Sequence, residues 1–315
     1  MYYIGVDIGG TGIKAGIVDE KGNILTKNSI ATKKGADYKD LVKDIYELIE
    51  KILCDTNLSF DDIKSIGMGC PGTIDDKAGN VIYANNLNLI NAPVCMELGR
   101  YIDKPIYINN DANCAALGEF FALEDDSISD FVAITLGTGV GGGVVINKKL
   151  YSGYMGAGGE LGHMVIEKDG EPCSCGRNGC WEAYSSATAL IRETEKMVVK
   201  NPDSYLAKLV EENGGKANGK IPWDAKDAGD KAGKMVIDRY IEYLSEGIAN
   251  IINSLRPQVI LIGGGMSRQG DNLIKPLNDA LKGKIYGGDL TESSKIVTAK
   301  LGNDAGIIGA AFLGK

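Results

Sequence analysis

The sequence predicts an α/β protein that is built from two related domains. Strand-like segments alternate with longer segments of helical periodicity along the 315 residues. A strand, a glycine-rich turn and a second strand occur in YYIGVDIGGTGIKAGIV, and a similar unit, DFVAITLGTGVGGGVVI, follows 128 positions later. This shift places Gly9 over Gly137 and Val18 over Ile146. Two similar units at that separation indicate a duplicated fold.

The first domain is expected to begin with consecutive antiparallel strands, because apolar residues alternate on both sides of the glycine turn. A second turn is predicted at 19–23. The segment DANCAALGEFFALE has the pattern of a helix, with Asp111 or Asn113 near its N-cap. The other elements predicted here are an amphipathic helix over 38–54, a strand over 63–69 and a strand over 106–110.

The second domain is expected to carry most of the helices. From 183 to 255 the chain is mainly helical, interrupted by the polar, glycine-rich stretch NGGKANGK. Apolar residues near the end of this segment recur at three- and four-residue steps, which is typical of a helix face packed in a core. The stripe comprises Ala232, Met235, Val236, Tyr240, Tyr243, Leu244, Ile248, Ile251, Ile252 and Leu255. A strand VILIGGG, a helix from about Asn272, a strand KIVTA and a last helix from about Ala305 complete the predicted order.

The length of the chain allows each domain its own hydrophobic core. We place the smaller N-terminal domain at 1–113 and the larger domain at 114–302. The last helix, within 303–315, is expected to pack back on the smaller domain.

Composition restricts the class of partner. Hydrophobic residues make up 44% of the chain and charged residues 24%, as in ordinary globular proteins. The formal net charge of −8 argues against a general affinity for nucleic acid or anionic membrane, which need a basic face. No apolar run approaches the roughly 20 residues of a membrane span, and the N-terminus lacks the basic start of a signal peptide. A cytoplasmic location is therefore expected.

The only histidine of the chain lies shortly before three cysteines. His163, Cys173, Cys175 and Cys180 offer one nitrogen and three sulfurs, which suits tetrahedral Zn²⁺. Four protein ligands leave no open coordination position, so the ion is expected to be structural and not catalytic. In a reducing compartment, clustered thiols ligate metal more often than they form disulfides. Unrelated small buried thiols and a surface histidine remain the alternative.

Three glycine-rich stretches are candidates for nucleotide binding. The first, DIGGTGIK, fits neither a dinucleotide fingerprint nor a Walker loop, because a strand follows its glycines and no Gly-Lys-Ser/Thr occurs. Glycines do let backbone amides approach phosphate oxygens, and Thr11 and Lys14 add a hydroxyl and a charge. The second stretch, LGTGVGGG, is a similar hairpin, and the two hairpins could bind one nucleotide between them, with Asp7 placed to hold hydrated Mg²⁺. An ordinary hairpin is the alternative.

The third stretch, LIGGGMSRQ, follows an apolar strand and could let an adenine ring lie flat on the backbone. A simple strand-to-helix turn is the alternative. The candidate nucleotide-binding residues of the three stretches are Asp7, Gly9, Gly10, Thr11, Lys14, Gly137, Thr138, Gly139, Gly263, Gly264 and Gly265.

These motifs together resemble the phosphate and adenosine motifs of the sugar kinase/actin/Hsp70 superfamily. Within it, GGELGHM followed by CSCGRNGCWE is similar to the signature of ROK-family sugar kinases, with the bacterial glucokinase branch the most similar. The resemblance covers nearly the whole chain. It implies two related domains of the ribonuclease H-like, actin-like ATPase fold with a cleft between them. It also implies ATP and Mg²⁺ as partners in the reaction, beside a structural Zn²⁺.

The resemblance also assigns roles to individual residues. NNDANCAALGE is similar to the catalytic segment of the family, which makes Asp111 the implied general base. The implied contacts to the sugar are Gly72, Asn86, Asn110, Asp111, Glu160, His163 and Glu182. A helix cap is the alternative for Asp111, and solvated side chains are the alternative for Glu160 and Glu182.

The expected activity is ATP-dependent phosphorylation of a hexose, D-glucose before others, at the 6-hydroxyl. A kinase for N-acetylmannosamine, N-acetylglucosamine or fructose is the alternative within the class, and polyphosphate remains an alternative donor. A sugar-sensing regulator without catalysis is opposed by Asp111. It is also opposed by the start of the first loop near residue 4, which leaves no preceding DNA-binding segment. An actin- or chaperone-like ATPase would not need the carboxylates beside the cysteines. A homodimer is expected.

Overall fold

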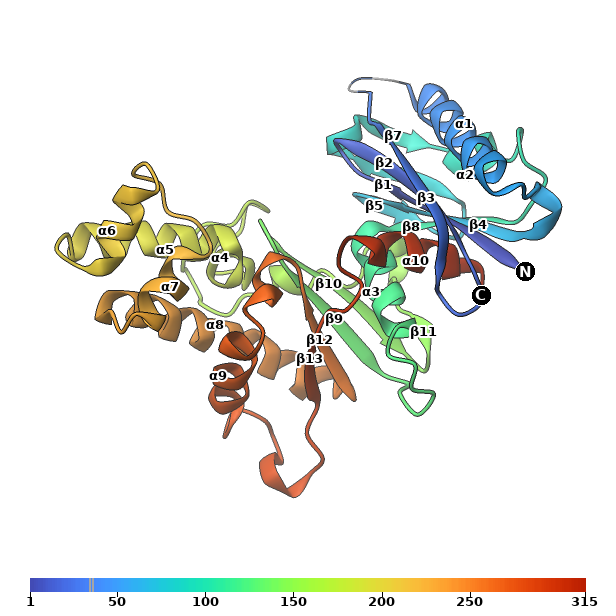
Figure 1. The fold of residues 1–315 in the computed structure, drawn as a ribbon. Helices are drawn as coiled ribbons and strands as arrows, with labels where there is room; N and C mark the ends of the chain where they lie inside the picture. The colour runs from blue at the N-terminus through green and yellow to red at the C-terminus, as the bar shows by residue number, and fades with distance from the viewer. Residues whose placement is uncertain (34, 36) are drawn as a thin grey trace. The chain divides into compact units, whose positions relative to one another are not determined.

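The computed structural model describes residues 1–33, 35 and 37–315, and these form two compact units. Unit 1 comprises Met1–Ala133, Gly142–Gly159 and Lys300–Lys315, and unit 2 comprises Ile134–Gly141 and Glu160–Ala299. Strands and helices alternate along the chain, so the protein has the predicted mixed α/β character (Figure 1). The domain limits predicted above, 1–113 and 114–302, stay a prediction.

The sheet of unit 1 has five strands in the order β3-β2-β1-β4-β8. The first three strands are antiparallel neighbours, as predicted, and β4 and β8 run parallel to β1. The strands are β1 (Tyr2–Ile8), β2 (Gly12–Val18), β3 (Ile24–Ala31), β4 (Ile63–Cys70) and β8 (Ile106–Asn110).

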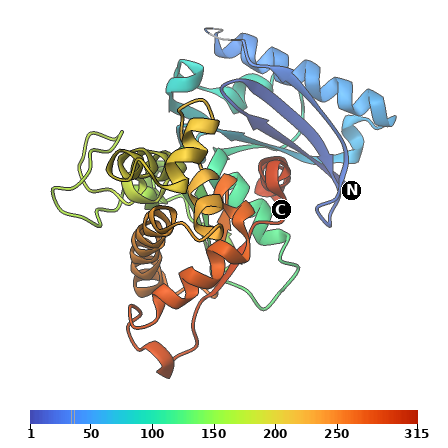
Figure 2. The same cartoon turned by 60° about the vertical axis from the view of Figure 1, so that its left-hand side comes forward.

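Helices pack against this sheet. Helix α1 (Tyr38–Thr56) extends two residues beyond the predicted end, where Asn57 adopts the left-handed conformation that ends helices. Its apolar side chains form one core with the sheet, and Figure 2 shows the helix along the strands. Helices α3 (Asp111–Phe121) and α10 (Ala305–Ala311) pack together. Helix α10 also packs against β1 and β4, and α3 packs against β4 and β8.

Glycines allow the close approach of α10. A Cβ atom on Gly5 would overlap the carbonyl oxygen of Ile307, and one on Gly67 would overlap that of Ala310. The last helix therefore packs on the N-terminal sheet, and the chain ends there.

A small antiparallel sheet in unit 1 was not predicted. It consists of β5 (Thr73–Asp75), β6 (Asn80–Ala84) and β7 (Leu89–Ala92), with the short helix α2 (Val94–Leu98) after it. Strands of three to five residues are too short for an alternating pattern to stand out in the sequence.

The second five-stranded sheet has the order β11-β10-β9-β12-β13. This order repeats that of the first sheet, with an antiparallel hairpin on one side and parallel strands on the other, as a duplicated fold requires. The strands are β9 (Phe131–Leu136), β10 (Val140–Ile146), β11 (Lys149–Leu150), β12 (Val259–Gly263) and β13 (Lys295–Thr298).

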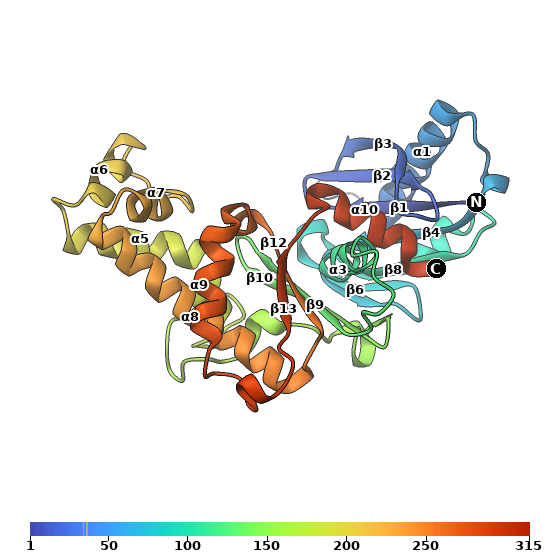
Figure 3. The same cartoon turned by 60° about the horizontal axis from the view of Figure 1, so that its bottom comes forward.

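Unit 2 carries the helical segment. Helices α8 and α9 lie side by side (Figure 3). Most of the predicted apolar stripe is buried along α8, but Met235 and Leu255 are 57% and 41% exposed, so their assignment to the core was wrong. Leu255 is the last residue of the helix, and Met235 lies on its exposed face with Asp238 and Glu242. The helices are α4 (Glu182–Ser185), α5 (Ala187–Lys200), α6 (Tyr205–Glu212), α7 (Ile221–Asp227), α8 (Lys231–Leu255) and α9 (Asp271–Leu281).

Short 3₁₀ helices connect these elements. They are η1 (Phe60–Asp62), η2 (Asn85–Leu87), η3 (Tyr154–Gly156), η4 (Leu161–His163), η5 (Gly265–Gln269), η6 (Gly288–Leu290), η7 (Gly302–Asp304) and η8 (Phe312–Gly314). Within the described ranges, no helix has both the length and the apolar character of a membrane span.

Candidate active site

The first glycine hairpin joins β1 to β2 in unit 1. The amide of Gly9 donates to the carbonyl of Gly12 at 2.9 Å and closes the turn. Asp7 and Lys14 are paired across the two strands, with 3.3 Å between Lys14 Nζ and Asp7 Oδ2. A Cβ on Gly306 would come within 3.1–3.3 Å of the Asp7 carboxyl, so the start of α10 lies beside this carboxylate. The predicted Asp7 and Lys14 are thus brought together next to the turn.

The segment with Asp111 lies at the carboxyl end of β8, where α3 begins. The N-cap is Asn110 and not Asp111 or Asn113: its side chain accepts from the amides of Ala112 and Asn113. Its amide nitrogen also donates to the carbonyl of Gly72 at 3.0 Å. Asp111 is the first residue of the helix, a position where the helix dipole stabilises a negative charge.

Two further predicted contacts lie in the same unit. Asn86 is exposed in η2, and its Cβ would be 3.3 Å from a Cβ on Gly10, so it lies against the first hairpin. Gly72 has a φ of 102°, and a side chain there would overlap the carbonyl of Tyr83. Unit 1 therefore holds Asn86 beside the glycine turn and joins Gly72 to the start of α3.

Buried polar residues behind Asp111 were missed by the sequence analysis. Asn109 donates to Ser152 Oγ at 3.1 Å and to Asp76 Oδ2 at 3.3 Å. Its side-chain oxygen accepts from the amide of Asn110 at 2.8 Å and from the side chain of Asn113 at 2.9 Å. Such a satisfied buried network fixes the end of β8. The only sequence signal for it was the polar run NND at the end of an apolar strand.

Two buried thiols lie near Asp111. Burial raises the pKa of Cys70, and the Asp111 carboxylate raises it further. Burial also raises the pKa of Cys114 well above its usual value. Both thiols are therefore neutral at physiological pH.

The second glycine hairpin joins β9 to β10. The amide of Gly137 donates to the carbonyl of Gly139 at 3.0 Å. The Glu182 carboxylate accepts from the amide of Val140 at 3.0 Å, directly after the turn. Its other oxygen accepts from Ser174 Oγ at 3.1 Å. Glu182 thus has partners on both sides, and a carboxylate with about four acceptor positions keeps further capacity.

The third glycine stretch ends β12 and begins η5. Gly264 has a φ of 80°, and a Cβ there would overlap the backbone of Leu136 at the end of β9. No atom in the described part of the chain lies within 4 Å of the Cβ position of Gly265, so its backbone is open on that side. The close strand packing explains Gly264, and the open side at Gly265 suits a flat ligand surface.

The predicted metal ligands come together in unit 2. The ligand atoms of His163, Cys173, Cys175 and Cys180 all lie within 4.8 Å of one another. Sulfurs at about 2.3 Å from a tetrahedral zinc lie roughly 3.8 Å apart, and the Sγ atoms of Cys175 and Cys180 are 3.6 Å apart. The donor set and its spacing fit Zn²⁺.

Backbone geometry and electrostatics favour a thiolate in this cluster. The amide of Arg177 donates to Cys175 and lowers its pKa. Burial raises the pKa of Cys180 to about 12, and a bound cation would reverse that effect. Gly176 and Gly179, with φ of 87° and 79°, provide the left-handed turns that bring the ligands together.

The histidine links the cluster to Glu160. His163 Nδ1 is 3.6 Å from Cys173 Sγ, and its Nε2 is 4.0 Å from Glu160 Oε2. The Glu160 side chain is 70% exposed. With Nδ1 on a metal, the imidazole would present its Nε2–H beside an accessible carboxylate.

Comparison with known proteins identifies the family of the chain. The model of the ROK family matches residues 3–315. The chain belongs to the ROK family. A glucokinase from Halalkalibacterium halodurans is 37% identical over 100% of this chain and 95% of its own length. An N-acetylmannosamine kinase from Haemophilus influenzae is 32% identical over 99% and 95% of the two chains.

A solved ROK structure has the same fold. The ROK family glucokinase from Streptomyces griseus, in complex with glucose and AMPPNP, is 32% identical with a TM-score of 0.78, and 99% of each chain is covered. The α/β fold predicted for this ROK chain is confirmed at that level. The more detailed prediction of two actin-like domains around a cleft stays a prediction.

The candidate residues of this ROK chain divide between the units. Asp7, the first hairpin, Gly72, Asn86, Asn110 and Asp111 lie in unit 1. Unit 2 holds the second hairpin (137–139), the third glycine stretch, Glu160, Glu182 and the His–Cys cluster. Their roles as predicted from the sequence stay predictions and are carried into the proposal below.

Proposed function

We propose that the chain is an ATP-dependent hexose kinase that converts D-glucose to glucose 6-phosphate. The observation that carries the proposal is the Asp111 carboxylate at the first turn of α3, in the same unit as the Asp7–Lys14 hairpin. The similarity over the full length to a glucokinase supports it. A base and a phosphate-binding hairpin are the two elements that phosphoryl transfer to a hydroxyl needs.

In the proposed reaction, the 6-hydroxyl oxygen of the sugar bonds to the γ-phosphorus of ATP, and the bond to the β,γ-bridging oxygen breaks. Asp111 accepts the hydroxyl proton, and ADP leaves. A positioned base contributes about 10²- to 10⁴-fold. Asn110 orients Asp111 through the helix cap and the Gly72 carbonyl.

The hairpins are proposed to bind the phosphates. Glycine amides approach phosphate oxygens closely, and the Lys14 ammonium adds a positive charge. The Asp7 carboxylate is proposed to hold hydrated Mg²⁺. The bound ion would neutralise part of the phosphate charge. The open backbone at Gly265 is proposed to face the adenine.

Glu160, His163 and Glu182 are proposed to bind the sugar hydroxyls, with Asn86, Asn110 and Gly72 contributing from unit 1. Two carboxylates accept from two hydroxyls, and His163 donates from Nε2 when Nδ1 ligates zinc. The zinc is proposed to hold the loop that carries these groups. An acetamido group at carbon 2 would displace the hydroxyl expected near these carboxylates and would need space for its methyl group, which favours glucose.

A substrate panel tests the proposal. The values of kcat/KM with Mg-ATP are compared for glucose, N-acetylmannosamine, N-acetylglucosamine and fructose, with a reaction lacking sugar to detect plain ATPase activity and one with polyphosphate as donor. Glucose is expected to exceed the others by tenfold or more. Should an N-acetyl sugar or fructose exceed glucose tenfold, the glucose assignment is wrong and the kinase class stands. Sugar binding without any sugar-dependent ADP formation would instead indicate a sensing regulator.

The expected homodimer, cytoplasmic location and lack of a nucleic-acid or membrane partner stay predictions. Size determination in solution, for example by light scattering, measures the first directly.

A further inference from the structure

We propose that Thr188 is a positioning residue for the nucleotide phosphates. Its hydroxyl, together with the Glu182 carboxylate, holds the second glycine hairpin (137–139) in the conformation that binds them. The inference rests on the proposed function, because it takes this hairpin to bind the nucleotide phosphates. Thr188 would then control nucleotide affinity without touching the nucleotide.

Three hydrogen bonds join the segment 182–188 to this hairpin. Thr188 Oγ1 donates to the carbonyl of Thr138 at 2.8 Å. The amide of Ala187 donates to the carbonyl of Gly137 at 2.8 Å. Glu182 Oε2 accepts from the amide of Val140 at 3.0 Å. These bonds involve the carbonyls of Gly137 and Thr138 and the amide of Val140, so the turn is held along its length by one short segment of chain.

The hairpin needs this support because it has little of its own. One internal bond, from the amide of Gly137 to the carbonyl of Gly139, closes the turn. Among the described residues, no atom lies within 4 Å of the Cβ position of Gly137, so its backbone is open on that side. Glycine loses more backbone conformational entropy on ordering than other residues. Hydrogen bonds from outside the loop reduce the entropy that is still lost when a ligand binds.

The contact with Glu182 is built into the sequence of the turn. A Cβ on Gly139 would overlap the Glu182 carboxylate. Glycine at position 139 therefore makes room for the Glu182 side chain, which accepts from the amide of the next residue, Val140.

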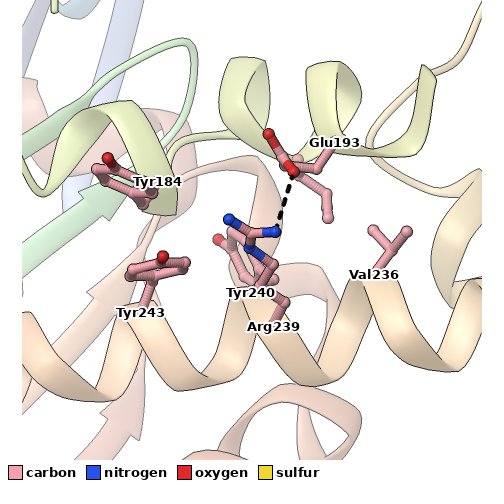
Figure 4. Close-up of a pocket in the computed structure, with 7 residues that line it drawn as sticks. Tyr184, Glu193, Val236, Arg239, Tyr240 and Tyr243 are labelled. Atoms are coloured by element: carbon pink, nitrogen blue, oxygen red, sulfur yellow. Dashed lines mark ion pairs between the residues drawn. The ribbon is translucent and has the colours of Figure 1, made fainter. Parts of the chain in front are cut away.

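The segment itself is anchored on α8. Tyr240 donates its hydroxyl to the carbonyl of Ser185 at 2.9 Å. The rings of Tyr184 and Tyr243 lie 4.4 Å apart, and the Arg239 guanidinium lies over Tyr243 and beside Glu193 (Figure 4). The pocket among these side chains is only about 10 Å³, which admits no more than one water molecule.

Thr188 lies at the capped start of α5. The Ser186 side chain accepts from the amide of Ala189, which caps α5, and Thr188 lies in its first turn with an exposed side chain. An exposed threonine adds little to the core, so its hydroxyl can be removed without a cavity. The rigid support behind it makes that hydroxyl a fixed donor for the Thr138 carbonyl.

The test compares Thr188→Val, which keeps the shape and loses the donor, with Thr188→Ser, which keeps the donor. Affinity for Mg-AMPPNP is measured by calorimetry, and KM is measured separately for ATP and for glucose. Thr188→Val should weaken nucleotide binding about five- to tenfold and raise the KM for ATP, with the KM for glucose within twofold of wild type. Thr188→Ser should restore binding to within twofold.

Thr56→Val is the matched control. Thr56 Oγ1 makes the same kind of bond, to the carbonyl of Ile52 at 3.0 Å, but within α1 of unit 1. The Thr56→Val variant should have the same nucleotide affinity as the wild type. Hydrogen exchange at 137–140 gives a second readout, and Thr188→Val should accelerate it.

The inference is overturned if Thr188→Val binds Mg-AMPPNP within twofold of wild type. It is also overturned if the variant weakens ATP and glucose equally, because Thr188 would then act on general stability. Failure of the wild type to bind Mg-AMPPNP would overturn the proposed function and this inference with it, and that result is distinct from the first two.

Discussion

The two glycine hairpins have the same design and different supports. Each turn is closed by one backbone bond, and each receives a threonine hydroxyl on a loop carbonyl. Thr32 donates to Gly9 at 2.6 Å, and Thr188 donates to Thr138 at 2.8 Å. The duplicated sequence explains the similar strands and turns.

The source of each threonine differs. Thr32 directly follows β3, the strand next to β2, so the first hairpin is supported by its own sheet. Thr188 comes from α5, fifty residues beyond its acceptor, and the chain reaches it through the His–Cys cluster and Glu182. The comparison shows that a duplicated hairpin can keep its local form while one copy comes to depend on a distant segment. The second hairpin should therefore respond to changes at the cluster, and the first should not.

The largest effect is expected at Asp111, which tests whether chemistry can be removed while both hairpins stay intact. Asp111→Asn should lower kcat about 10²- to 10⁴-fold, because a base acts mainly in the transition state. Affinity for Mg-AMPPNP should stay within about threefold, as measured by calorimetry, since neither hairpin is altered. Asp19→Asn, in a turn of the same unit, is the control. A fall in kcat of less than tenfold would show that another residue is the base.

Loss of the metal is expected to have the next largest effect and to separate the hairpins. Cys175→Ser should abolish bound zinc in elemental analysis and lower the unfolding temperature by about 10 °C, because structural zinc contributes folding free energy. Hydrogen exchange should accelerate at 137–140 and stay unchanged at 9–12. Cys54→Ser, at an exposed cysteine of α1, should change neither. Metal-free protein with full stability would contradict the structural role of zinc.

The smallest effect is expected at Thr32, which compares the supports directly. Thr32→Val should weaken Mg-AMPPNP binding about two- to threefold, less than Thr188→Val. Its own amide still donates to the carbonyl of Thr11 at 3.2 Å, and the strand pairing of β1 and β2 remains. Calorimetry on both variants shows which substitution weakens Mg-AMPPNP binding more. If Thr32→Val proved the weaker binder of the two, the first hairpin would be the one that depends on its threonine.

Several features of the fold were predictable from local patterns. The repeat at 128 positions located both hairpins, and strands β2 (Gly12–Val18) and β10 (Val140–Ile146) have matching limits after that shift. The periodicity of α1 gave its start, and its end to within two residues. The spacing of His163 and the cysteines indicated their association, and their ligand atoms do lie together. Period and spacing are properties of neighbouring residues, which a single sequence displays directly.

Other features could not be predicted in this way. The sheet of β5, β6 and β7 is too short to show a period, and Asn110 was not recognised as the cap of α3 because three neighbouring polar residues could each cap it. Asn109 and Thr188 carry no motif, so nothing in the sequence distinguished them from other polar residues.

By itself, the sequence determined the α/β class, the duplicated hairpins, the cluster of candidate metal ligands and the resemblance to the ROK family. Only the tertiary structure decided which groups support each hairpin and which side chains surround Asp111. The physical reason is that hydrogen bonds such as those from Thr188 Oγ1 to the Thr138 carbonyl and from the Val140 amide to the Glu182 carboxylate join segments more than forty residues apart. Their energies depend on distances of a few ångströms that the fold sets and local pattern does not record.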